Sequence, residues 1–194
     1  MKHFQFIVPF ALIALLCACQ VETTPKTPTP KTSPYRAGIT SLHTVEDQEA
    51  FLLDLFRRDQ EIRLQMDSIT QTFGYQSEEW VERQMAMHTQ DSINLIKTEI
   101  YLETFGYPAR DQFSELAVSA PWAVIHHWNV PEDRIRLYPY MRKAWDQGKI
   151  DAGQFSFFLS RTYRSQFGED FKMEGKFWPE QKIDTLEKLL GLID

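Results

Sequence analysis

The chain has little cysteine, and its two thiols, Cys17 and Cys19, both lie near the amino terminus. The rest of the chain therefore contains no pair of thiols that could form a disulfide. About 150 residues are enough to bury the apolar surface that one compact domain needs. We therefore expect a single domain that depends on its hydrophobic core alone.

A long apolar run is also missing, because a membrane-spanning helix needs about 20 apolar residues. The apolar stretch Phe4–Leu16 is shorter, follows Lys2 and His3, and precedes small residues, as in an export signal. Leu16-Cys17-Ala18-Cys19 resembles the bacterial lipobox, in which the last Cys is acylated and the preceding peptide is removed. We expect residues 1–18 to be a lipoprotein signal peptide and Cys19 to be lipidated; the alternative is an ordinary signal peptide that contains two cysteines.

Apolar residues are scarce directly after Cys19. The segment Gln20–Pro34 consists mostly of Thr, Pro, Lys and Ser, with one aliphatic residue. Such a composition buries too little apolar surface to offset the entropy of ordering, and proline keeps it extended. We expect residues 19–40 to be a disordered tether and residues 41–194 to be a helical domain.

The domain also lacks an excess of positive charge. Residues before 41 hold four of the 21 basic and one of the 27 acidic residues, which leaves 17 against 26 and a net charge of −9. This balance argues against nucleic acid and against an anionic bilayer surface as partners of the domain. The expected partners are membrane lipid, through acylated Cys19, and an envelope protein or small ligand of unknown identity.

The residue after the lipidated cysteine bears on location in the cell envelope. Gln20 stands where an Asp favours retention in the inner membrane of some bacteria. The sequence therefore favours the outer membrane and leaves the periplasmic and surface faces open.

Strand-like alternation is nearly absent, whereas apolar residues recur at the three- and four-residue spacing of a helix face. We expect an all-α fold with about six helices, which begin near Thr44, Ser77, Ser114, Pro131, Asp151 and Glu180. The second helix should turn Val81 and Met85 inward, and the last should turn Ile193 inward. Residues 168–179 should be irregular or form a small hairpin.

Several polar residues interrupt the apolar helix faces. Asp59 continues the stripe of Leu55, and Arg63 lies one turn later. Either the two side chains pair at the edge of the core, or Asp59 points into a polar pocket, because an unpaired buried carboxylate is costly. Asp91 and Asn94 lie in mid-helix, where their side chains compete with backbone hydrogen bonds, so both a functional use and a solvated position stay open.

The string Trp122–Trp128, WAVIHHW, places two histidines side by side in an apolar run. Consecutive helical residues point about 100° apart, so His126 and His127 cannot both face one small metal ion. The HExxH spacing and cysteine ligands are absent, and we expect neither a metal nor another cofactor. One histidine should meet a buried acid. Arg161, beside an aromatic helix face, should pair with Asp59 or Asp91, or reach water at the helix edge.

Short polar motifs follow one another in order along the chain. Asp-Gln-x-x-Arg, Asp-x-x-Asn and Gly-Tyr-Pro occur as Asp59, Gln60, Arg63, Asp91, Asn94, Gly106, Tyr107 and Pro108. In these motifs and in their spacing, residues 51–192 resemble a bacterial family of uncharacterised, often exported, all-α proteins.

The chain departs from three later motifs of that family. His126 stands where Gln is usual before His127, Ser160 replaces Asp before Arg161, and Phe167-Gly168-Glu169-Asp170 replaces Tyr-Gly-Thr-Gln. The family implies no activity, but it implies that the motif residues group together. The candidate polar cluster is therefore Asp59, Arg63, Asp91, Asn94, His127 and Arg161.

Two functions are consistent with this sequence. The first is a membrane-anchored helical module that binds a component of the cell envelope or has a structural role there. The second is an envelope hydrolase, in which His127 is the general base, Asp59 or Asp91 orients it, and Arg161 or Arg63 stabilises an anion. No nucleophile elbow, zinc motif or phosphate loop supports the hydrolase, so we favour the binding or structural module.

Overall fold

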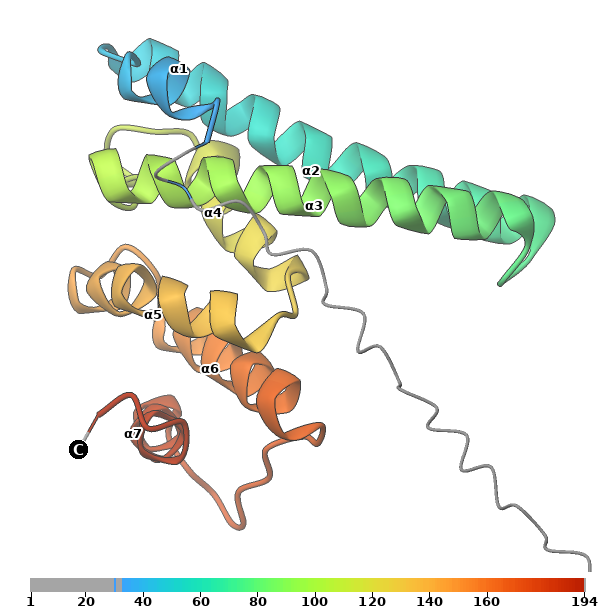
Figure 1. Ribbon diagram of the computed structural model, residues 1–194. Helices are drawn as coiled ribbons and strands as arrows, with labels where there is room; N and C mark the ends of the chain where they lie inside the picture. The colour runs from blue at the N-terminus through green and yellow to red at the C-terminus, as the bar shows by residue number, and fades with distance from the viewer. Residues whose placement is uncertain (1–29, 31–32, 194) are drawn as a thin grey trace, which may run out of the picture.

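The computed structural model describes Pro30 and residues 33–193, and the expected signal peptide, Cys19 and most of the tether lie outside them. The described residues form seven helices and no strand, which confirms the all-α prediction (Figure 1). The helices are α1 (Arg36–Thr40), α2 (Val45–Phe73), α3 (Glu78–Phe105), α4 (Glu115–His127), α5 (Pro131–Asp146), α6 (Ala152–Phe167) and α7 (Pro179–Leu189). None of them is long and apolar enough to cross a membrane.

The expected boundary between tether and domain at residue 41 is wrong. Helix α1 covers five residues that the composition assigns to the tether, and it packs against α3. Ile39 is buried, and Tyr35 packs against the core. The folded part therefore begins before α1, because this single short helix contributes its own apolar contacts.

Helices α2 and α3 form a long antiparallel hairpin, which Figure 1 shows reaching past the other helices at its turn. Thr44 and Ser77 cap the two helices by accepting hydrogen bonds from the backbone N–H groups of Asp47 and Trp80. The expectation that Val81 and Met85 face inward is wrong, because these residues are 44% and 62% exposed. They lie near the hairpin turn, beyond the reach of the helices that cover its base.

The remaining helices build the core at the base of this hairpin. Helix α4 packs against α2 and α3, and α6 packs against both α5 and α7. The capping box of Asp151 and Gln154 starts α6, as the sequence predicts. Residues 168–178 are irregular, and Ile193 is 38% exposed, so its inward prediction is wrong.

Candidate functional site

Asp59 is a buried acid at the junction of three helices. It lies on the face of α2 that α3 and α4 cover, and its side chain is only 1% exposed. His127, at the end of α4, places its Nδ1 atom 3.1 and 3.0 Å from the two carboxylate oxygens. The Gln60 side-chain amide donates a further hydrogen bond of 2.8 Å. Asp59 is therefore not exposed in a pocket, and its pairing with Arg63, the first of the two expectations, is present at 3.4 Å.

Arg63 extends this contact to the neighbouring helix. Its Nη1 atom donates to the backbone carbonyl of Asp59 at 2.9 Å and lies 3.4 Å from the Asp59 carboxylate. Its Nη2 atom donates to both oxygens of Asp91 on α3, at 3.0 and 3.1 Å. Asp59, Arg63, Asp91 and His127, named here the interhelix cluster, therefore link α2, α3 and α4.

The charged groups of the interhelix cluster are partly or fully buried, and their ion pairs offset the cost of this burial. Desolvation raises the pKa of Asp91, and the nearby Arg63 guanidinium opposes this rise. One guanidinium thus faces two carboxylates, and His127 supplies a further donor to one of them. The ion pairs and hydrogen bonds compensate for the cost of placing these charges among packed helices.

Two of the six candidate residues lie apart from the interhelix cluster. Asn94 is fully buried on α3, accepts a hydrogen bond from Gln90 at 2.8 Å, and leaves its Nδ2 atom without a partner among the described residues. Arg161 on α6 donates to Asn129 at 2.7 Å. The expected pairing of Arg161 with Asp59 or Asp91 is wrong, since no carboxylate of the described residues pairs with it.

His126 faces an aromatic environment instead of the buried acid. Its ring stacks on Trp122 and Phe157, with centroid distances of 4.7 and 5.0 Å, and its Nδ1 atom is buried without a partner in the described part of the chain. The space beside these rings has no room for a water molecule. His126 is thus a packing residue, and His127 is the histidine that meets the acid.

This environment predicts a loss of stability in mild acid. Burial, with repulsion from Arg161 and His127, lowers the pKa of His126 from 6.5 to about 4. The unfolded chain then binds a proton that the folded protein does not bind, so the free energy of unfolding should fall as the pH decreases from 6.5 to 4. Urea unfolding at several pH values measures this decline.

Two variants isolate the contribution of His126. His126→Phe should flatten part of the decline because it keeps an aromatic stack and removes the titrating group. His43→Gln, at an exposed histidine, should leave the decline unchanged. Equal slopes for the wild type and His126→Phe would contradict the assignment.

Arg134 is a buried charge that the sequence interpretation missed. It is fully buried on α5 and donates to the backbone carbonyls of Ile125, Trp128 and Phe158 at 2.7, 2.6 and 2.9 Å. Its Nε atom donates to the Thr162 hydroxyl at 3.0 Å, and burial lowers its pKa. The sequence contains a signal for this burial, because Arg134 lies on the same face of α5 as the buried residues Leu137 and Met141.

Two further buried carboxylates join helices that are distant in sequence. Arg136 on α5 donates to both oxygens of Glu99 on α3, each at 2.8 Å. Glu187 on α7 accepts two bonds of 2.8 Å from Arg142 on α5 and one of 2.7 Å from a tyrosine hydroxyl. Buried ion pairs between helices are thus a general feature of this domain.

The interhelix cluster contains few of the groups that a catalytic or metal site needs. The contact of His127 with Asp59 has the form of an acid–base pair, in which the carboxylate orients the imidazole. No three His, Cys, Asp or Glu side chains of the described residues are grouped so that they could hold a metal ion. Of the two arginines that the hydrolase hypothesis names as anion stabilisers, Arg161 lies elsewhere and is bonded to Asn129, whereas Arg63 lies in the interhelix cluster and is bonded to Asp59 and Asp91.

Comparisons of the chain with protein-family models, with curated proteins and with solved structures give no match.

Proposed function

We propose that this chain is a bacterial lipoprotein whose helical domain is a binding or structural module of the cell envelope. Acyl chains on Cys19 hold it at a membrane, and the residue that follows Cys19 favours the outer membrane. The export-signal pattern of residues 1–18 supports a location in the cell envelope. The acidic domain stands clear of the anionic lipid surface, since like charges repel.

The linkage of three helices through Asp59 and Arg63 is the observation that carries the non-enzymatic role. The Asp59 carboxylate, 1% exposed, contacts His127 of α4, and Arg63 bonds both Asp59 and Asp91 of α3. A carboxylate that orients a catalytic histidine is commonly buried as well, so the support comes from Arg63, whose guanidinium joins α2 to α3. The interhelix cluster therefore holds α2, α3 and α4 in their relative orientation. This role supports a binding or structural module better than it supports an envelope hydrolase.

The lipid anchor has a direct test in two matched variants. Cys19→Ser removes the thiol that would be acylated, so the full-length protein, expressed in a bacterial host, should leave the membrane fraction. Cys17→Ser keeps a small residue two positions before Cys19 and should stay in the membrane fraction, because it leaves the lipobox pattern intact. Fractionation followed by immunoblotting measures both, and a density gradient separates the inner from the outer membrane.

A Cys19→Ser protein that stays membrane-bound would overturn the anchor. Loss of both variants from the membrane fraction would also count against it, because Cys17 is not the acylated position. In the first case the α-helical domain would need another means of attachment to the membrane.

A further inference from the structure

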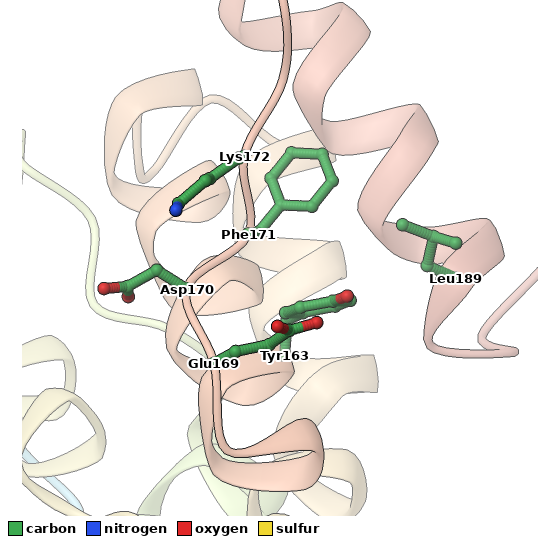
Figure 2. Close-up of a pocket in the computed structure, with 6 residues that line it drawn as sticks. All are labelled: Tyr163, Glu169, Asp170, Phe171, Lys172 and Leu189. Atoms are coloured by element: carbon green, nitrogen blue, oxygen red, sulfur yellow. The ribbon is translucent and has the colours of Figure 1, made fainter.

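A pocket of about 410 Å³ opens between the end of α6, the irregular segment 168–178 and α7. Figure 2 shows the six residues that line it, which are Tyr163, Glu169, Asp170, Phe171, Lys172 and Leu189. Its volume is within the range of small-molecule sites, which is about 300–1,000 Å³. It lies on different helices from the interhelix cluster, so the two sites can be tested separately.

Aromatic rings form one wall of this pocket. The rings of Tyr163 and Phe171 meet edge to face with their centroids 5.5 Å apart, and the ring of Phe167 lies near Tyr163 with a centroid distance of 4.6 Å. Leu189, half exposed on α7, faces them across the opening (Figure 2). These side chains give the pocket an apolar part beside three charged lining residues, Glu169, Asp170 and Lys172.

The charges around the pocket leave one carboxylate free to meet a ligand. Asp170 is held by Arg164, which donates to its two oxygens at 2.6 and 2.5 Å. Neither Glu169 nor Lys172 has an ion pair with any described residue, and the positive charge of Lys172 helps to lower the pKa of Asp170. In Figure 2 the Glu169 carboxylate projects to the same side of the segment as Phe171 and Tyr163, whereas Lys172 projects to the other side.

We propose that this pocket binds a small organic cation, a ligand in which an ammonium group is joined to a short apolar body. The faces of Tyr163 and Phe171 attract an ammonium through their ring quadrupoles, and the Glu169 carboxylate supplies the opposite charge. Leu189 contacts the apolar body. This inference rests on the proposed binding role of the domain and names the ligand class for it.

Choline is a suitable probe because it carries a quaternary ammonium, and 3,3-dimethylbutan-1-ol is its neutral carbon analogue of the same shape. The purified full-length protein, in a maltoside detergent that contains no ammonium group, is titrated with each compound. The readout is the NMR shift of the Tyr and Phe ring signals. Choline should bind in saturable fashion, and the neutral analogue should bind at least about threefold more weakly, the difference that one cation–π contact makes at an exposed site.

Three variants assign the contacts. Glu169→Gln and Phe171→Leu should each weaken choline binding by about threefold to tenfold, because each removes one attraction for the cation. Glu174→Gln, a carboxylate of the same segment outside the pocket lining, should leave the affinity unchanged. Circular dichroism melting of each variant shows whether the fold is intact.

Equal affinity for choline and its neutral analogue would overturn the proposal, as would the absence of saturable binding to the folded protein. Equal weakening by Glu169→Gln and Glu174→Gln would also overturn it, because the effect would then be one of overall charge. Cys19→Ser should bind choline as the wild type does. A failed membrane anchor and a failed cation site are therefore distinguishable.

Discussion

Arg134→Met is expected to lower the free energy of unfolding by about 3 kcal/mol, although it replaces a charge with an apolar side chain of similar length. The guanidinium satisfies the carbonyls of Ile125 and Trp128 at the end of α4, where no following helical turn supplies donors. It also bonds the Phe158 carbonyl on α6. Methionine leaves these acceptors buried and unpaired, and each costs about 1–3 kcal/mol, offset in part by removal of the desolvated charge.

Urea unfolding followed by circular dichroism measures this loss as a shift of the midpoint at constant slope. Arg164→Met is the matched control, because Arg164 is exposed on α6 and pairs only with Asp170 at the surface. Its loss should be less than about 1 kcal/mol. A smaller loss for Arg134→Met than for this control would show that Arg134 does not connect α4 to α6.

Arg134→Lys separates charge from geometry. A lysine keeps the positive charge, but its single ammonium cannot donate along the planar fork that reaches three carbonyls and one hydroxyl. The variant should therefore lose most of what Arg134→Met loses. Full stability in Arg134→Lys would assign the role of Arg134 to charge alone.

Asp59→Ala is expected to cost about 3 kcal/mol, because it leaves the other members of the interhelix cluster without their shared acceptor. His127 loses the carboxylate at 3.0 Å, and Arg63 then faces only Asp91. Removing one partner of a buried charged network is more damaging than removing an exposed pair. Thermal and urea unfolding of the variant measure the change.

Asp54→Ala, on the same helix, is the control for this loss. Asp54 is exposed and pairs with Arg57 and Arg58 at the surface, so its removal should cost less than about 1 kcal/mol. An Asp59→Ala protein as stable as Asp54→Ala would contradict an architectural role for the interhelix cluster. The buried acid would then have to be retained for some other reason.

Local sequence signals were enough to predict most of the helices. Thr44, Ser77 and Asp151 cap their helices as expected, and the apolar spacing gives the right inward faces where a third helix covers them. The same spacing fails at Val81 and Met85, because periodicity shows that a helix has an apolar face but not that anything covers it. Helix α1 was missed because its five residues follow a proline-rich stretch and carry almost no periodic signal.

The candidate polar site divides in a similar way. Asp59, Arg63, Asp91 and His127 lie together because each is the polar member of an apolar face, so burial forces it to find a partner. Arg161 pairs instead with Asn129, since the distance between segments that are far apart in sequence is not encoded in spacing. Arg134 was missed although it continues the apolar stripe of α5, because arginine is common on solvated helices and three of its four acceptors are backbone carbonyls, which have no sequence signature.

The unequal lengths of the helices divide the α2–α3 hairpin into two parts. Helix α2 has 29 residues and α4 has 13, lengths of about 43 and 20 Å, so α4 covers less than half of the hairpin. Fewer apolar contacts oppose local opening where only two helices meet, and backbone amides near the Gly74 turn should exchange with solvent sooner than those near Leu55. Trp128, just past α4, still contacts His88 on α3 with ring centroids 5.2 Å apart, so early exchange is expected in the part of the hairpin between His88 and the Gly74 turn.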